Sequence, residues 1–130
     1  MIVLWVAVGS AIGGVCRFLL GVAVQQRIES AFPLGTLVIN VTGSFLVGFL
    51  IRIATGSTAL SADVRAMLIT GFCGGYTTFS AFSFEIATLI EDGTYGWATL
   101  YVGVSAGLAL LGTFGGFALA RVLLAAAYGD

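Results

Sequence analysis

Long apolar stretches alternate with short polar connections along the whole chain. A helix needs about 20 mostly apolar residues to cross the hydrocarbon core of a bilayer. Four stretches reach that length, at about residues 2–24, 34–53, 64–90 and 97–127. No room is left for an extramembrane domain, because the connections are only residues 25–33, 54–63 and 91–96. The pattern predicts a single all-α domain of four transmembrane helices, and Pro33 stands where the second of them can begin without losing a hydrogen bond.

The third apolar stretch is interrupted near its middle by Gly74-Gly75-Tyr76-Thr77-Thr78-Phe79-Ser80-Ala81-Phe82-Ser83. We expect the adjacent glycines to break the helix, because glycine is a poor helix former. Lipid cannot hydrogen-bond the backbone groups that a break sets free, so protein or water must do so. The interruption therefore predicts a cavity or an ion beside the third helix.

Composition supports a membrane protein and excludes several functions. Hydrophobic residues make up 59% of the 130 residues, charged residues only 8%, and the mean hydropathy is +1.11. A net charge of −1, with five arginines and no lysine, gives no basic face for nucleic acid. No histidine or lysine is present to activate a serine, and the spans hold no paired carboxylates, so we predict no enzyme. Cys16 and Cys73 cannot complete a zinc site without histidine, and they are assigned no function.

The arginines bear on orientation and assembly. Arg52, Arg65 and Arg121 lie on the side of the predicted bundle that carries both termini, and Arg27 lies on the other side. This bias slightly favours cytoplasmic termini, but so few charges also allow insertion in both orientations. Four helices are too few to enclose a wide pore. Because glycines four residues apart favour close helix contacts, we expect a dimer, with a monomer or a subunit of a larger complex as alternatives.

Polar side chains form stripes at helical spacing within three of the predicted spans. Most hydroxyls in membrane helices bond to their own backbone or to a neighbouring helix. Asn40 differs, because its own helix cannot satisfy its two amide donors. The stripes comprise Thr36, Asn40 and Ser44 in the second span, Thr77, Ser80 and Ser83 in the third, and Tyr101, Ser105 and Thr113 in the fourth.

Donors without a fixed cation suit a small anion that must bind and leave again. The edges of Phe79 and Phe82 are electropositive and could line such a path, although ordinary packing is the more common use of phenylalanine. Carbonyl oxygens at the interruption could instead bind a cation such as Na⁺.

Three segments together resemble the Fluc (CrcB) family of fluoride channels. They are Gly13-Gly14-Val15-Cys16-Arg17-Phe18, Gly35-Thr36-Leu37-Val38-Ile39-Asn40, and the long and specific Gly71-Phe72-Cys73-Gly74-Gly75-Tyr76-Thr77-Thr78-Phe79-Ser80-Ala81-Phe82-Ser83-Phe84-Glu85. The resemblance implies a passive fluoride-selective channel that exports cytoplasmic fluoride from a prokaryotic cell across its plasma membrane. It also implies an antiparallel, dual-topology dimer with two pores.

The resemblance also implies roles for individual residues. Asn40 would be the pore amide, Phe79 and Phe82 the edge-on aromatic ligands, and Arg17 a vestibule residue. Gly74 and Thr77 would give backbone carbonyls to a structural Na⁺ at the dimer interface. Hydroxyls beside the fluoride path would come from Ser80, Ser83, Tyr101 and Ser105. Ala81 and Ala109 lack hydroxyls that some family members carry there.

Two other functions and one other assembly remain open at this stage. A proton-coupled exporter of the small multidrug resistance type is disfavoured, because the first span carries Arg17 and no acidic residue. A non-transporting membrane subunit is disfavoured by the polar stripes, which cost free energy against lipid. The chain could also pair with an oppositely oriented homologue instead of a second copy of itself.

Overall fold

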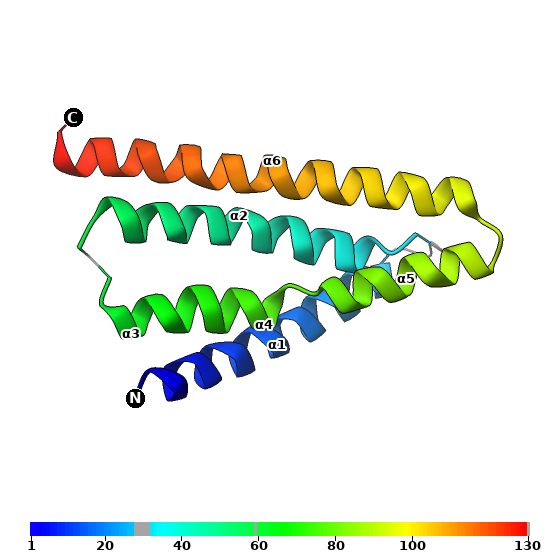
Figure 1. Cartoon of the computed structure of the whole chain (residues 1–130), viewed down its shortest axis with the longest axis horizontal. Coiled ribbons are helices and arrows are strands. Elements are labelled where there is room, and N and C mark those ends of the chain that lie inside the picture. The colour runs from blue at the N-terminus through cyan, green and yellow to red at the C-terminus, as the bar shows by residue number, and fades with distance from the viewer. Residues whose placement is uncertain (28–31, 59, 130) are drawn as a thin grey trace.

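The computed structural model describes residues 1–27, 32–58 and 60–129, and all regular structure within these ranges is helical. Three helices are long and apolar enough to span a membrane: α1 (Ile2–Arg27), α2 (Leu34–Gly56) and α6 (Tyr95–Tyr128). Figure 1 shows α6, α2 and the line of α3 to α5 lying roughly side by side, with α1 crossing obliquely. Both chain termini lie at the same end of this bundle. The chain is therefore a multi-pass helical membrane protein.

The connections are shorter than the sequence suggested. Residues 25–27 continue α1, and residues 28–31 of the predicted first connection lie outside the described part. The helix α2 begins directly after Pro33 and continues to Gly56. The turn before α6 contains Gly93, whose φ of 71° lies in the left-handed region that glycine adopts readily.

The third span consists of four helical segments in sequence. The short helix α3 (Ala62–Arg65) leads into the π-helix η1 (Ala66–Cys73), and α4 (Gly74–Tyr76) follows without a gap. Thr77 and Thr78 are extended, with ψ of 158° and 112°, and α5 then runs Phe79–Glu91. A π-helix of this length is rare, and π-turns often accompany functional sites.

The prediction that Gly74 and Gly75 break the helix is wrong. Both glycines are part of α4, and the extended residues are the two threonines that follow. Gly75 is needed for packing: a Cβ atom there would lie 2.5 Å from the carbonyl oxygen of Ser10 in α1. The β-branched threonines fit an extended backbone better than a helical one.

Glycines let two pairs of helices approach closely. The helix α1 packs on η1 and α4, and Cβ atoms at Gly9 or Gly13 would clash with backbone oxygens of η1. The helix α2 packs on α6, where a Cβ at Gly112 would lie 2.9 Å from the Val41 carbonyl oxygen. The packing interpretation of glycines four residues apart is confirmed at these contacts. Gly103 and Gly107 make no such contact within the described chain, since a Cβ at either would meet nothing within 4 Å.

Candidate functional site

Asn40 of α2 satisfies the backbone of the interruption in the third span. Its Nδ2 donates to the Thr78 carbonyl oxygen at 3.1 Å, and its Oδ1 accepts from the Thr78 N–H at 2.9 Å. The Thr78 hydroxyl in turn accepts from the N–H of Ala81 at 3.1 Å and caps α5. The backbone groups that the interruption sets free at Thr78 and Ala81 therefore have hydrogen-bond partners, as buried backbone groups require. The second Nδ2 hydrogen has no partner among the described residues.

A hollow of about 290 Å³ lies beside this interruption. Asn40 and Phe79, which the sequence predicts beside the fluoride path, both line it. Thr113, across the hollow on α6, has its hydroxyl 3.1 Å from the Ala109 carbonyl oxygen of its own helix and 3.4 Å from the Ser44 carbonyl oxygen of α2, so these backbone oxygens are its acceptors. The lining consists of Asn40, Ser44, Val47, Thr77, Thr78, Phe79 and Thr113.

A second polar cluster forms around Glu85, in the second turn of α5. Its Oε1 accepts a hydrogen bond from the Thr36 hydroxyl, and its Oε2 accepts one from the Tyr101 hydroxyl, both at 2.6 Å. Bonds of this length are typical of an O–H donor to a carboxylate. Tyr101 is fully buried, and its ring centroid lies 5.1 Å from that of Phe82. The cluster therefore joins α2, α5 and α6.

Sequence reasoning left Glu85 without a role, because it stands alone in its span. The stripes on α2 and α6 held the missing signal. Thr36 and Tyr101 each stand first in their stripe, so both stripes offer a hydroxyl at one end of the bundle. A carboxylate between two such donors is partnered in a way that an isolated acid is not.

The hydroxyl of Ser105 has no hydrogen-bond partner in the described part of the chain. Ser105 lies one turn after Tyr101 on α6 and is only 7% exposed. Buried side-chain hydroxyls are nearly always partnered, so an unpartnered one calls for a specific explanation. This buried oxygen lies near the Tyr101 hydroxyl.

Of the remaining predicted path residues on α5, Phe79, Ser80 and Ser83 are exposed and Phe82 is half-buried. Phe79 is 79% exposed, and its ring centroid is 5.8 Å from that of the half-buried Phe82. The Ser83 hydroxyl donates to the Phe79 carbonyl of its own helix at 3.0 Å. Ser80 lies 3.3 Å from the Thr78 hydroxyl. A single chain thus presents these residues on an open face of the third span.

Arg17 and Gly74 are not brought into either cluster. Arg17 is half-buried on α1 and does not line the hollow beside Asn40. Gly74 is exposed, and a Cβ there would meet nothing within 4 Å. The Thr77 hydroxyl donates to the Cys73 carbonyl at 3.0 Å, while its backbone departs from the helix.

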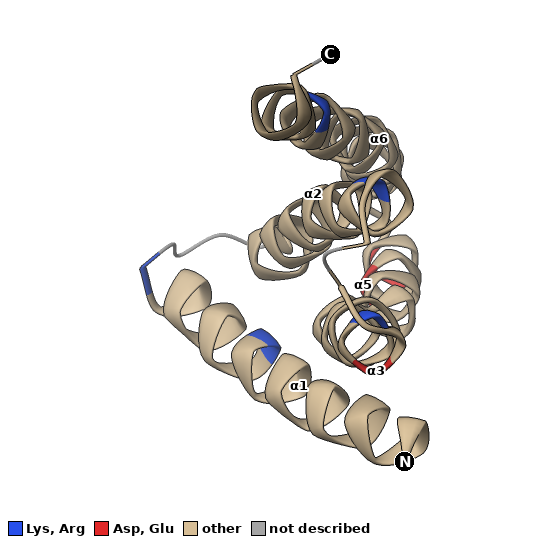
Figure 2. Cartoon of the chain, turned by 90° about the vertical axis from the view of Figure 1, so that its left-hand side faces the viewer, with Lys and Arg blue, Asp and Glu red and all other residues tan. Residues whose placement is uncertain are grey.

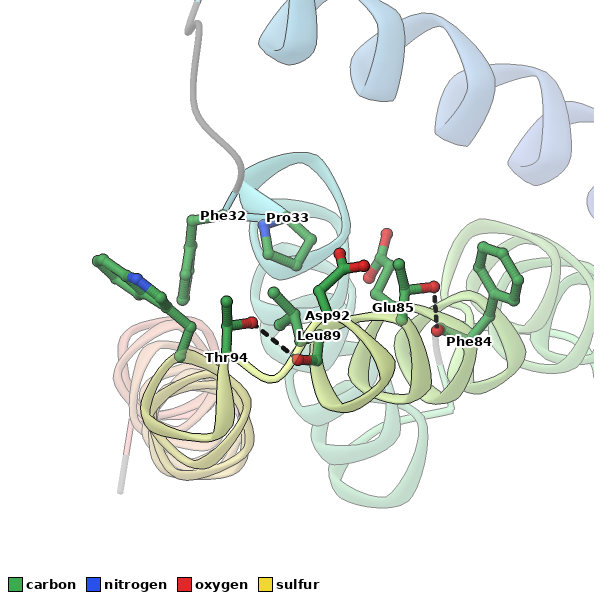
Figure 3. Close-up of a pocket in the computed structure, with 9 residues that line it drawn as sticks. Phe32, Pro33, Phe84, Glu85, Leu89, Asp92 and Thr94 are labelled. Atoms are coloured by element: carbon green, nitrogen blue, oxygen red, sulfur yellow. Dashed lines mark hydrogen bonds between the residues drawn. The ribbon is translucent and has the colours of Figure 1, made fainter.

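A larger hollow of about 400 Å³ opens where α2 begins and α5 ends. Figure 3 shows the carboxylates of Glu85 and Asp92 on one side of Pro33, with Phe32 and Thr94 on the other side. Glu85 therefore borders this hollow and also contacts the buried hydroxyls of α2 and α6. Its position connects the end of the bundle with the polar interior.

Comparison with known proteins identifies the family of this chain. The sequence pattern of the family described as "CrcB-like protein, Camphor Resistance (CrcB)" matches residues 4–117. A relative from Rhizobium meliloti (strain 1021), named "Fluoride-specific ion channel FluC", is 46% identical over 94% of this chain and 98% of its own length. Relatives of the same name from Roseiflexus sp. (strain RS-1) and Geobacter sulfurreducens are 46% and 45% identical, and they cover 95% and 93% of this chain and 99% and 98% of their own. The resemblance seen in the motifs is confirmed, and the chain belongs to the CrcB family.

Proposed function

We propose that this protein is a passive fluoride channel that exports cytoplasmic fluoride and so reduces its toxicity. The names of relatives that match over nearly their full length support fluoride as the conducted ion. The structural observation that carries the proposal is the hollow that brings the Asn40 amide and the Phe79 ring together beside the interrupted helix. It offers neutral donors and an aromatic edge to an anion without a fixed cation that would retain it.

The path requires a small anion that can exchange its water for such donors. Asn40 would offer the free hydrogen of Nδ2, and Ser105 its unpartnered hydroxyl. Tyr101 has one hydroxyl hydrogen, which it gives to Glu85, so its contribution to the path is its ring unless that bond opens. Phe82, between Tyr101 and Phe79, would continue the aromatic lining.

The proposed assembly is an antiparallel dimer of dual topology with two pores, in the inner membrane of a prokaryote. The high exposure of Phe79 supports it, because a path residue on an open face needs a second surface to exclude lipid. The carbonyls of Gly74 and Thr77 would hold a structural Na⁺ between the copies. The open space at Gly74 and the extended backbone at Thr77 fit that role, since both leave room for a carbonyl to meet an ion.

Reconstituted liposomes test the function directly. Purified protein should release fluoride and retain chloride, and Phe79→Ile or Phe82→Ile should suppress fluoride release by removing the polar ring edge while nearly keeping the bulk. Phe114→Ile, at an exposed aromatic of α6 outside both clusters, is the matched control and should leave release unchanged. Folded protein that releases no fluoride, or equal losses from all three variants, would refute the proposal.

The same preparation tests the alternative function and the alternative assembly. A proton-coupled exporter would accumulate a cationic dye under a proton gradient, and α1 carries no acidic residue to couple that movement. Crosslinking within the purified protein tests the homodimer, since a chain that needs an oppositely oriented homologue would remain monomeric and inactive by itself.

A further inference from the structure

The ends of α2 and α6 that lie beside the C-terminus enclose a hollow of about 450 Å³. From α2 it takes Arg52 and the residues three and four positions later, and from α6 it takes Arg121 and residues three, four and seven positions later. Residues at these spacings share one helix face, so the two arginines lie on the facing sides of neighbouring helices. The lining consists of Arg52, Thr55, Gly56, Arg121, Leu124, Ala125 and Tyr128.

The two guanidinium groups have no counterion in the described part of the chain. Neither α2 nor α6 contains an acidic residue, and neither guanidinium group has a hydrogen bond or ion pair with any described residue. Figure 2, which faces this end of the bundle, shows basic segments on α2 and α6 and no acidic segment on either helix. Arg65 differs, since it donates to the carbonyls of Leu60 and Ser57 at 3.1 and 3.4 Å.

Part of the wall of the hollow is apolar. Leu124 contacts the end of α2, where a Cβ added to Gly56 would lie 2.5 Å from its methyl group, and Ala125 adjoins it. Tyr128, in the last turn of α6, is exposed at the end of the span, the depth at which aromatic residues meet lipid headgroups. Charged, apolar and aromatic side chains thus lie together at this end of the bundle, where a phosphate headgroup and an acyl chain would meet them.

We propose that this hollow binds the phosphate of an anionic phospholipid, with its acyl chain along Leu124. Guanidinium groups suit phosphate oxygens, and basic pockets between membrane helices commonly hold anionic headgroups. Both helices end here, and the carbonyl ends of helices disfavour anions. A free phosphate would have only the arginines to offset that effect, whereas a lipid adds the apolar contact of its chain.

Lipid retention in detergent tests the site on the full-length protein. Phosphatidylglycerol should bind about 30-fold more tightly than phosphatidylcholine, because each basic residue near an anionic headgroup contributes about fivefold. The double substitution Arg52→Gln with Arg121→Gln should remove that preference. Arg27→Gln, which removes the same charge from the exposed end of α1, is the control and should keep it.

Several results would overturn the proposal. Equal binding of the two lipids by the unaltered protein would do so without any variant, as would a preference that survives the double substitution. Loss of the preference in the Arg27→Gln control would show general surface attraction instead of a site. Full displacement of phosphatidylglycerol by millimolar inorganic phosphate would assign the arginines to a free anion. Reduced fluoride release with unchanged lipid binding would assign them to the conduction path.

Discussion

Replacing Asn40 with alanine should destabilise the protein more than its modest change in size suggests. The substitution removes a donor to the Thr78 carbonyl and an acceptor for the Thr78 N–H. Thr78 is only 8% exposed, so water cannot easily replace the amide. Each buried group left unpaired costs about 1–3 kcal/mol, which gives roughly 2–6 kcal/mol for the pair.

Measured side-chain hydrogen bonds between membrane helices are weaker, averaging about 0.6 kcal/mol, because the unfolded segments also find partners in the membrane. That compensation is limited here. The lost partners belong to an extended backbone, and refolding Thr77 and Thr78 into a helix would move α5 relative to α4. We therefore expect the free energy of unfolding to fall by about 2–4 kcal/mol.

Reversible unfolding in mixed detergent micelles measures this loss. Asn40→Leu separates its two causes, because leucine restores the volume but pairs neither backbone group. Ser44→Ala, one turn later on α2, removes a hydroxyl for which the described residues provide no bond and should change stability by less than about 0.5 kcal/mol. If Asn40→Leu proves as stable as the unaltered protein, packing accounts for the loss and the hydrogen-bond reasoning fails.

Three further predictions concern packing, the buried carboxylate and the unpartnered hydroxyl. Gly13→Ala should cost about 1–3 kcal/mol in the same unfolding assay, because its Cβ would meet a backbone oxygen of η1, whereas Gly14→Ala meets nothing and should be neutral or stabilising. Thr36→Val and Tyr101→Phe should show losses that do not add, with a coupling above about 0.5 kcal/mol, since both hydroxyls contact one carboxylate; strict additivity would contradict the shared cluster. Ser105→Ala should leave stability within about 0.5 kcal/mol yet slow fluoride release; unchanged release would remove this hydroxyl from the path.

Much of the fold could be predicted from the apolar pattern, because the membrane requires long apolar helices of nearly fixed length. The position of the interruption could not. Gly74 and Gly75 have the weakest helix propensity of the segment, yet contact with α1 determines the use of Gly75, and the side chain of Asn40 stabilises an opening at the threonines. The π-helix was not predicted either. An apolar sequence has the same pattern whether its backbone hydrogen bonds join residues four or five positions apart.

The site residues differ in how far sequence reasoning could reach them. Asn40 was recognisable, because an amide in a membrane helix needs partners from outside that helix. Those partners could not be identified, since they come from a segment 38 residues away. Glu85 was missed for the same reason, because its donors lie on two other helices. Pairings across a bundle depend on the rotation of each helix, which a stripe on one helix does not determine.

Substitutions of Asn40 and of Ser105 therefore test conduction in different ways. Asn40 supports the interruption that shapes the third span, so lost fluoride release in its variants could reflect either a missing ligand or a displaced α5. The Ser105 hydroxyl makes no hydrogen bond to a described residue and lies near the Tyr101 hydroxyl. Removing it withdraws a donor and little else. A change in fluoride release from Ser105→Ala at unchanged stability would therefore report on the path itself, and it would show that the aromatic and hydroxyl residues near Tyr101 continue the route that starts beside Asn40.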